Sequence, residues 1–435
     1  MVVFVALLVV GLVLRALGVP YAGTYDMDNL VSWGQDVDRL GLAKGYVPLP
    51  GSYFPAAYQV FGLSIGLARA IGVSPIVGLK AVNLALDTGT LLLLIAVLRQ
   101  WKLPVAYSLI YWLNPYFIVT NWLGYVDFHP AFFVLLSLWL LGRARSALAT
   151  IVAALPLGIA TAMKPQAITL VAMLGAFVVV QLVRGRRSEP DTTRAWLLLL
   201  GPVAVFAAYS AFFIAHGKSL LFLVRGYLDV GRFMPALTAQ MPNIWYPVAD
   251  FYRDKGALIE SVVEPKAFHT VAAVLTAALL VFVTARIARD PDRRPFPVRV
   301  LLLFTAGAAI LPMLMTRAHE NHFFLAATLG VVLVALLGDR PLTILVNALL
   351  AMQAVHLFGL YGLGENRVTT ALGLEKWLDV DVQGIRYGVK AYALDQPHLQ
   401  TVVACITTVL FAAAAYRLVT VVRTTSPSTG RGPGR

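Results

Sequence analysis

Long apolar blocks restrict this sequence more than any other feature does. They lie at residues 2–19, 76–98, 103–122, 128–142, 147–163, 166–183, 195–215, 267–285, 300–316, 322–338, 341–361 and 399–418. Only 13% of the residues are charged, which is about half the fraction in soluble domains. A β-barrel would show short alternating segments instead of these blocks. The pattern predicts an all-α polytopic membrane protein with about 12 transmembrane helices.

Two features of the blocks affect this interpretation. The first block has no basic segment before it and is longer than the apolar part of a signal peptide, so we expect a retained helix. Several blocks are shorter than the roughly 20 residues that cross a bilayer, which indicates broken or tilted helices. Cys405 is the single cysteine, so no intramolecular disulfide can form.

The charges between the blocks are unevenly distributed. With the N-terminus placed in the cytoplasm, the inner connections and the C-terminal tail carry the whole net charge of +13, and the rest of the chain is neutral overall. Short cytoplasmic loops of membrane proteins show this excess of Lys and Arg. The basic character therefore indicates anionic lipid headgroups as partners, and no nucleic acid. Both termini are predicted to be cytoplasmic.

Three long connections fall on the predicted outer side, at residues 20–75, 216–266 and 362–398. They are rich in Asp, Tyr, Trp, Pro and Gly, whereas the inner connections are short and basic. The sequence predicts one transmembrane domain over residues 1–423 and a disordered cytoplasmic tail at 424–435. We expect the functional site on the outer face.

The first outer loop begins with Asp26 and Asp28. Four apolar residues then recur with helical spacing: Leu30, Trp33, Val37 and Leu40. This stripe predicts an amphipathic helix in the membrane interface, with Trp33 at headgroup level. A second interfacial helix is predicted over residues 54–71.

The residues alone allow two interpretations of Asp26. A carboxylate between a membrane span and an interfacial helix can face a lipid-carried sugar and a hydroxyl acceptor, and act as a general base. Alternatively, Asp26 or Asp28 simply caps the helix. The Asp-x-Asp spacing does not favour a shared metal, because residues two apart on a helix diverge by roughly 200°.

Four further polar clusters interrupt the apolar sequence on the predicted outer side. They are Asn114-Pro115 with residues 124–130, residues 164–166, residues 243–247 and residues 317–322. Ionisable residues beside membrane spans are costly and mark functional sites by default. Arg317, His319 and Lys164 could stabilise a phosphate leaving group. Snorkelling cations and interface anchors such as Trp245 would explain the same residues without a function.

Residues 319–322 also contain two histidines. His319 and His322 are three residues apart, whereas the familiar zinc helix has its histidines four apart, and no third ligand is evident. We therefore expect no metal and no cofactor.

The ordered motifs resemble the GT-C superfamily of polyprenyl-phosphate-sugar-dependent glycosyltransferases. The closest resemblance is to prokaryotic relatives of the dolichyl-phosphate-glucose glucosyltransferases of lipid-linked oligosaccharide assembly. The matching motifs are Asp26 seven residues before Trp33, Tyr53-Phe54-Pro55, Asn114-Pro115, Gly124-Tyr125-Val126-Asp127, Lys164-Pro165-Gln166, Asn243 with Trp245, and Arg317 with His319 and Glu320. Tyr125 replaces the usual Gln, and Phe54-Pro55 replaces Pro-Pro. The resemblance spans roughly residues 1–340.

The resemblance implies an inverting, metal-independent transfer at the outer leaflet of a prokaryotic plasma membrane. The donor would be a polyprenyl-phosphate hexose, mannose ahead of glucose, and the acceptor a lipid-linked or other glycan. Asp26 would be the general base, and the donor phosphate would be held by Arg317, His319 and Lys164. The sugar or the acceptor would contact Asp28, Asp127, His129, Asn243, Trp245 and Glu320.

The main alternative is a secondary transporter with twelve helices and both termini inside. The two halves of the sequence show no repeat relation, and the outer loops are long and amphipathic, which does not favour a carrier. A non-catalytic membrane scaffold is the third possibility.

Overall fold

A computed structural model describes residues 2–21, 23–24, 26–48, 53–229, 235–254, 259–289, 294–361, 381–382, 385–386 and 397–424. The predicted outer loop at 362–398 therefore lies mostly outside the described residues, and so does the predicted tail. The described chain is almost entirely helical. Its two short strands, β1 (Asp381–Val382) and β2 (Ile385–Arg386), pair antiparallel.

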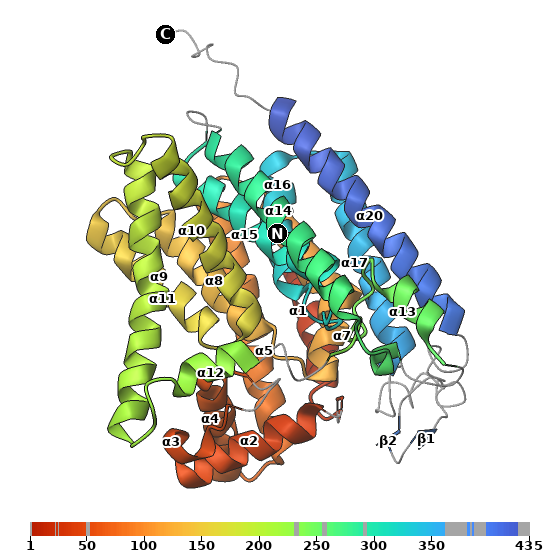
Figure 1. The fold of residues 1–435 in the computed structure, drawn as a ribbon. Coiled ribbons are helices and arrows are strands. Elements are labelled where there is room, and N and C mark those ends of the chain that lie inside the picture. The colour runs from red at the N-terminus through yellow and green to blue at the C-terminus, as the bar shows by residue number, and fades with distance from the viewer. Residues whose placement is uncertain are drawn as a thin grey trace.

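Seven helices in the described part of the chain are long and apolar enough to cross a membrane. They are α5 (Pro75–Gln100), α10 (Ile168–Val183) with the turn η2 (Pro165–Ala167) before it, α11 (Pro190–Ala215), α14 (Lys266–Arg289), α15 (Phe296–Leu314), α17 (Arg340–Tyr361) and α20 (Pro397–Thr424). They form a bundle of roughly aligned helices (Figure 1). The predicted integral membrane protein is confirmed.

Twelve full-length spans are not confirmed. Four apolar helices have 14 to 16 residues: α1 (Val2–Leu17), α8 (Phe128–Leu141), α9 (Ala147–Thr161) and α16 (Phe324–Leu337). At about 1.5 Å per residue they are shorter than the roughly 30 Å hydrocarbon layer. The block at 103–122 divides into η1 (Val105–Tyr107), α6 (Ser108–Leu113) and α7 (Pro115–Leu123). Asn114 caps α7 there, and Pro115 cannot continue α6.

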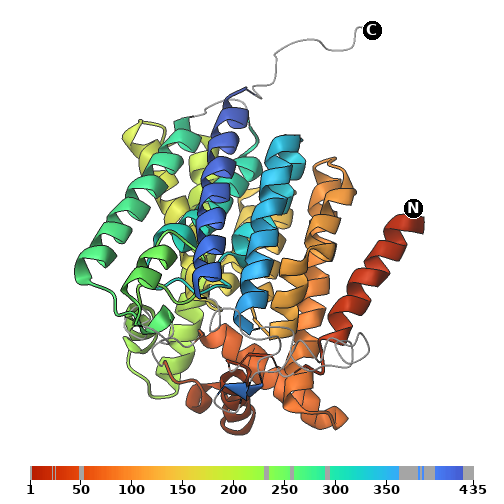
Figure 2. The same ribbon diagram turned by 90° about the vertical axis from the view of Figure 1, so that its right-hand side faces the viewer.

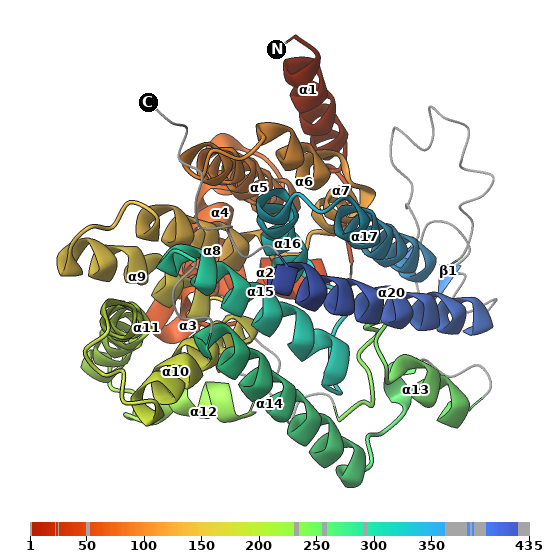
Figure 3. The same ribbon diagram turned by 90° about the horizontal axis from the view of Figure 1, so that it is seen from above.

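The helix α16 lies at the centre of the bundle when it is seen from above (Figure 3). Every residue from Phe324 to Ala335 is buried, and α16 packs against α5, α8, α15 and α17. A helix that is apolar on all sides suits such a position. The core therefore forms around a helix that is too short to span the bilayer alone.

The two helices predicted for the first outer loop are present as α2 (Asp26–Leu40) and α4 (Pro55–Ile71). With α3 (Leu42–Gly45) they lie at one end of the bundle (Figure 1). Part of the stripe on α2 packs against protein, because Leu30 is buried and Trp33 stacks on Tyr58 with ring centroids 5.3 Å apart, whereas Leu40 is exposed. A Cβ on Gly34 would lie 2.7 Å from Ile65, so the two helices pack closely.

Three shorter elements complete this end: α12 (Phe222–Asp229), α13 (Tyr246–Tyr252) and η4 (Ile259–Ser261). The start of α1 and the end of α20 point to the opposite end (Figure 2). Both ends of the described chain thus lie on one side of the bundle. The described helices of the predicted outer loops at 20–75 and 216–266 lie on the other side (Figure 1).

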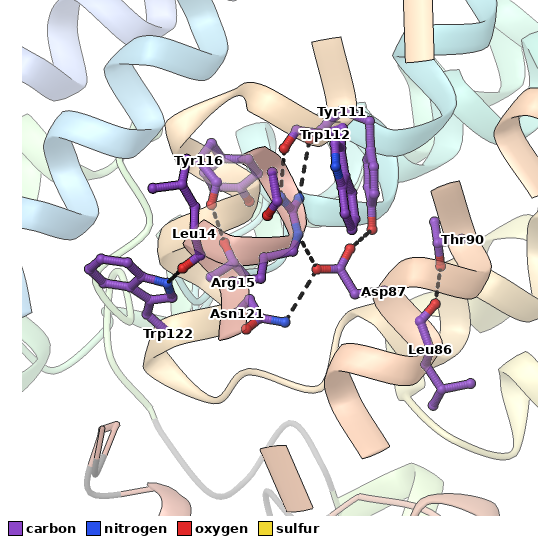
Figure 4. A network of polar contacts seen from close by, with 12 residues as sticks. Leu14, Arg15, Leu86, Asp87, Thr90, Tyr111, Trp112, Tyr116, Asn121 and Trp122 are labelled. Atoms are coloured by element: carbon purple, nitrogen blue, oxygen red, sulfur yellow. Dashed lines mark hydrogen bonds and ion pairs between the residues drawn. The ribbon is translucent and has the colours of Figure 1, made fainter. Parts of the chain in front are cut away.

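A buried ion pair fastens α1 to the rest of the bundle (Figure 4). Arg15 Nε lies 2.5 Å from Asp87 Oδ2, and neither side chain is exposed. Tyr111 and Asn121 donate hydrogen bonds to the same carboxylate, at 2.5 and 3.2 Å. Arg15 also donates to the carbonyl oxygen of Trp112 at 2.5 Å. The hydrogen bonds compensate for removing both charges from water.

Two tryptophans hold α1 at closer range. A Cβ on Gly11 would lie 2.3 Å from the Trp112 ring, and one on Gly18 would lie 2.1 Å from the Trp122 ring. Each indole N–H donates to a backbone carbonyl of α1 at 2.7 Å. These contacts fix the position from which the chain leaves α1 and continues toward α2.

The ion pair generates a stability prediction. Arg15→Met leaves the Asp87 carboxylate buried without its cation, so we expect a loss of about 3–5 kcal/mol in the free energy of unfolding. The double variant Arg15→Met/Asp87→Leu removes both charges and should recover most of that loss. Denaturant unfolding in detergent measures both variants. Equal losses in the single and double variants would contradict this account.

Candidate functional site around Asp26

Asp26 is the first residue of α2, directly after the turn that follows α1. Its carboxylate lies in the first turn of the helix, where the helix dipole favours negative charge. The preceding backbone is fixed because Thr24 N donates to Leu123 O at 3.1 Å. Gly23 has a φ of +86°, and a Cβ there would lie 2.7 Å from Leu123 O. Only glycine fits such a position without strain.

A buried ion pair lies near Asp26. Lys164 precedes η2, and its Nζ lies 2.7 Å from Oδ1 of Asp127 in the turn between α7 and α8. Both residues are buried, and the second oxygen of Asp127 has no hydrogen-bond partner among the described residues. The ammonium also lies 5.4 Å from the ring centre of Tyr53. Lys164 is therefore already neutralised by Asp127.

Glu320 lies between α15 and α16 and is held by two tyrosines. The hydroxyl of Tyr361, at the end of α17, donates to Oε1 at 2.7 Å, and the hydroxyl of Tyr125 donates to the same oxygen. Glu320 is buried, and burial raises its pKa above the ordinary value. Tyr125 is the residue that departs from the family motif, and here it binds Glu320.

The segment before α13 brings in a further carboxyl group. Backbone N–H groups of Ala239 and Met241 donate to Ala318 O at 3.1 and 3.2 Å, which places this segment beside residues 317–320. The amide of Gln240 donates to Glu260 in η4. Burial raises the pKa of Glu260 against the effect of this hydrogen bond.

Several of these groups shift the pKa of Asp26. Burial raises the pKa of Asp26 from 3.8 to about 6, and the carboxylates of Glu320 and Glu260 act in the same direction. His319 and Lys164 oppose this shift. Residues from three separate connections therefore act on one carboxyl group. A carboxyl with a pKa near 6 exchanges protons close to neutral pH.

The two histidines have mainly local contacts. Burial lowers the pKa of His319 to about 4, so its ring is neutral at pH 7. The backbone N–H of His319 donates to Nδ1 of His322 at 3.2 Å, and His322 also bonds to the Gln166 amide. Among the described residues, no group of three or more His, Cys, Asp or Glu is arranged to hold a metal ion.

Arg317 is bound elsewhere. Its guanidinium forms an ion pair with Glu264, whose side chain is fully buried. The same carboxylate accepts a hydrogen bond from Thr316 at 2.6 Å and lies 2.9 Å from His269 Nδ1. Arg317 is not among the charges that shift Asp26. The three cations proposed to hold a phosphate therefore include two that carboxylates already bind and one neutral imidazole.

The Asn-x-Trp motif contacts the end of α15. Asn243 Nδ2 donates to the carbonyls of Pro312 and Met315 at 2.9 and 3.1 Å, and Trp245 Nε1 donates to Leu314 O at 2.6 Å. Carbonyls at a helix end lack hydrogen-bond donors within the helix. Asn243 and Trp245 provide such donors at the end of α15. The motif therefore orients the connection that carries Glu320.

Two other candidates lie at the periphery of the cluster. His129 is buried, and its Nε2 lies 2.8 Å from Asn83 Oδ1. Asp28 is exposed on α2. Sequence reasoning missed Glu260, Gln240 and Tyr361. An acid within the apolar run around Glu260 was the signal that could have identified it.

The raised pKa of Asp26 predicts a pH-dependent stability. The folded protein binds the Asp26 proton more tightly than the unfolded chain, so ionisation of Asp26 destabilises the fold as pH rises from about 4 through about 6. Asp26→Asn should therefore melt at a higher temperature than wild type at pH 7.5 and at the same temperature near pH 4. Thermal unfolding across this range measures the difference. A difference independent of pH would show that Asp26 is not perturbed.

A comparison with known families shows a partial match. Residues 89–253 match the family described as GPI transamidase subunit PIG-U. No curated protein matches the chain. The matched region runs from α5 to the residue after α13 and covers less than half of the chain. The match and the helical architecture support a membrane-embedded protein of the GT-C-like type.

This match corrects two predictions. The similarity is to a GPI transamidase subunit, and a relation to the dolichyl-phosphate-glucose glucosyltransferases is not supported. The prediction of a polyprenyl-phosphate-hexose-dependent glycosyltransferase is wrong for the same reason, because PIG-U is a subunit of a transamidase. The coarser prediction, a membrane protein of the GT-C-like type, is supported. The motifs do not carry the reaction that the resemblance implied.

Proposed function

We propose that this protein binds the sugar head of a membrane glycolipid in the polar cluster around Asp26. The observation that carries the proposal is the excess of carboxyl groups over uncommitted cations in the cluster. Asp26, Glu260 and Glu320 surround the site, while Lys164 is paired with Asp127. Carboxylates accept hydrogen bonds, and sugar hydroxyls donate them.

Buried polar atoms support a hydroxyl-rich ligand. Those without a hydrogen-bond partner among the described residues include Asp127 Oδ2, Tyr116 Oη, Gln166 Oε1 and Asn321 Oδ1. Tyr116 interacts electrostatically with the carboxyl groups of Asp127 and Glu320. Because buried polar groups are normally hydrogen-bonded, a polar ligand or ordered water would complete them.

The position of the cluster supports a lipid-linked sugar. Asp26, Glu260 and Glu320 lie in connections at the end of the apolar helices that also carries α2 and α3. A sugar bound there remains attached to an acyl chain in the bilayer. The matching family is named for a subunit of GPI transamidase, and GPI is itself a glycolipid. The excess of basic residues in the opposite connections supports an outward-facing site.

Native mass spectrometry of the purified protein in detergent tests this function. Diglucosyldiacylglycerol should bind, and phosphatidylcholine with the same acyl chains should bind at least about tenfold more weakly, because it offers no sugar hydroxyls. Equal binding of the two lipids would contradict the proposal.

Matched variants locate the binding site. Asp26→Asn should weaken diglucosyldiacylglycerol binding by about tenfold, because it removes a charged hydrogen-bond acceptor. Asp28→Asn makes the same chemical change at an exposed position two residues away and should have little effect. Equal effects of both variants would place the sugar elsewhere.

A further inference from the structure

Lys80 is a buried lysine in the first part of α5. Only 1% of its surface is exposed, and its ammonium donates to three backbone carbonyls, those of Gly18, Tyr21 and Trp122, at 3.1, 2.5 and 2.5 Å. A lysine ammonium has three donors, so all of them are satisfied. In the described part of the chain, no carboxylate contacts it.

The three carbonyls belong to two segments that are far apart in the sequence. Gly18 and Tyr21 lie in the turn between α1 and Asp26, and Trp122 lies in the last turn of α7. The first segment leads directly to Asp26. The second leads to residues 124–127, where Tyr125 binds Glu320 and Asp127 binds Lys164.

Other contacts show how closely the two segments fit together beside Lys80. Thr24 N donates to Leu123 O at 3.1 Å. Gly124 has a φ of +82°, and a Cβ there would lie 2.2 Å from Met27 Sδ and 3.4 Å from Cε of Lys80. A displacement of either segment would therefore separate Asp26 from the opposite wall of the site.

We propose that Lys80 is a positioning residue that holds the two sides of the Asp26 site in register. Its ammonium joins the segment before Asp26 to the segment that carries Tyr125 and Asp127. The effect on sugar binding rests on the proposed function, whereas the effect on the two segments does not.

The chemistry at this position favours positioning over simple packing. A buried cation without a carboxylate is costly, and a methionine of similar volume would avoid that cost. The nearby Arg15 is different, because Asp87 compensates its charge. Only a group with several donors can join three carbonyls at one point, so the specific gain from Lys80 is the connection itself.

The first test measures the two segments directly. Thr24→Cys/Leu123→Cys in a Cys405→Ser background places two thiols where the segments meet, and copper phenanthroline then forms the disulfide. Lys80→Met should slow disulfide formation by on the order of tenfold, because the carbonyls lose their common donor. Lys44→Met, at an exposed position on α3, is the matched control and should leave the rate unchanged.

The second test connects the segments to the site. Lys80→Met should weaken diglucosyldiacylglycerol binding by on the order of tenfold, and the disulfide between positions 24 and 123 should restore the affinity. Lys80→Gln, which keeps two donors, should fall between wild type and Lys80→Met and serves if Lys80→Met does not fold. A merely structural role would not predict rescue by the crosslink.

The outcomes separate the two proposals. Unchanged disulfide formation in both Lys80 variants would overturn the positioning role, whatever the sugar affinity. Loss of affinity that the crosslink does not restore would also overturn it. Absence of sugar binding in wild type would refute the proposed function, while the disulfide rates would still decide the role of Lys80.

Discussion

The structure depends on the need to compensate every charge that the apolar bundle buries. Arg15 is paired with Asp87, Lys164 with Asp127, and Arg317 with Glu264, whereas Lys80 is held by three carbonyls. A buried charge without such partners would be too costly for a protein of marginal stability. Asp26 differs from these pairs, because two carboxylates add to the effect of burial and raise its pKa.

This pattern also explains how a short helix and several loops form one site. Arg15 and the Trp112 and Trp122 contacts fix α1, and α1 determines where the chain reaches Asp26. Asn243 fixes the end of α15 in the same way, and thereby the connection that carries Glu320. Rigid supports of this kind position the side chains more accurately than the loops could alone.

The sequence was sufficient to predict the helical membrane class, the helices of the first outer loop and several polar residues of the site. Apolar blocks and short motifs can be recognised from neighbouring residues alone, without knowledge of the contacts that the folded chain makes. The sequence could not show which charges pair, because pairs such as Arg317 with Glu264 depend on contacts far apart in the chain. The sequence predicted that Arg317, His319 and Lys164 bind a phosphate. In the structure, carboxylates already bind Arg317 and Lys164.

The prediction of the reaction was limited in the same way, because it also relied on short motifs. The motifs around Asp26 and His319 resemble those of sugar-transferring enzymes, yet residues 89–253 match a GPI transamidase subunit. Motifs that place polar groups at the end of a helical bundle report a shared architecture, and function depends on the chemistry of the individual site. The proposed binding of sugar hydroxyls rests on such a feature, the excess of carboxyl groups over uncommitted cations around Asp26.

The most direct measurement is a cryo-electron microscopy structure of the protein in nanodiscs that contain diglucosyldiacylglycerol. The account predicts sugar density in contact with Asp26 and Glu320, with the acyl chains in the bilayer and the Lys164–Asp127 pair intact. Sugar density at another surface, with the cluster around Asp26 filled only by water, would contradict the account.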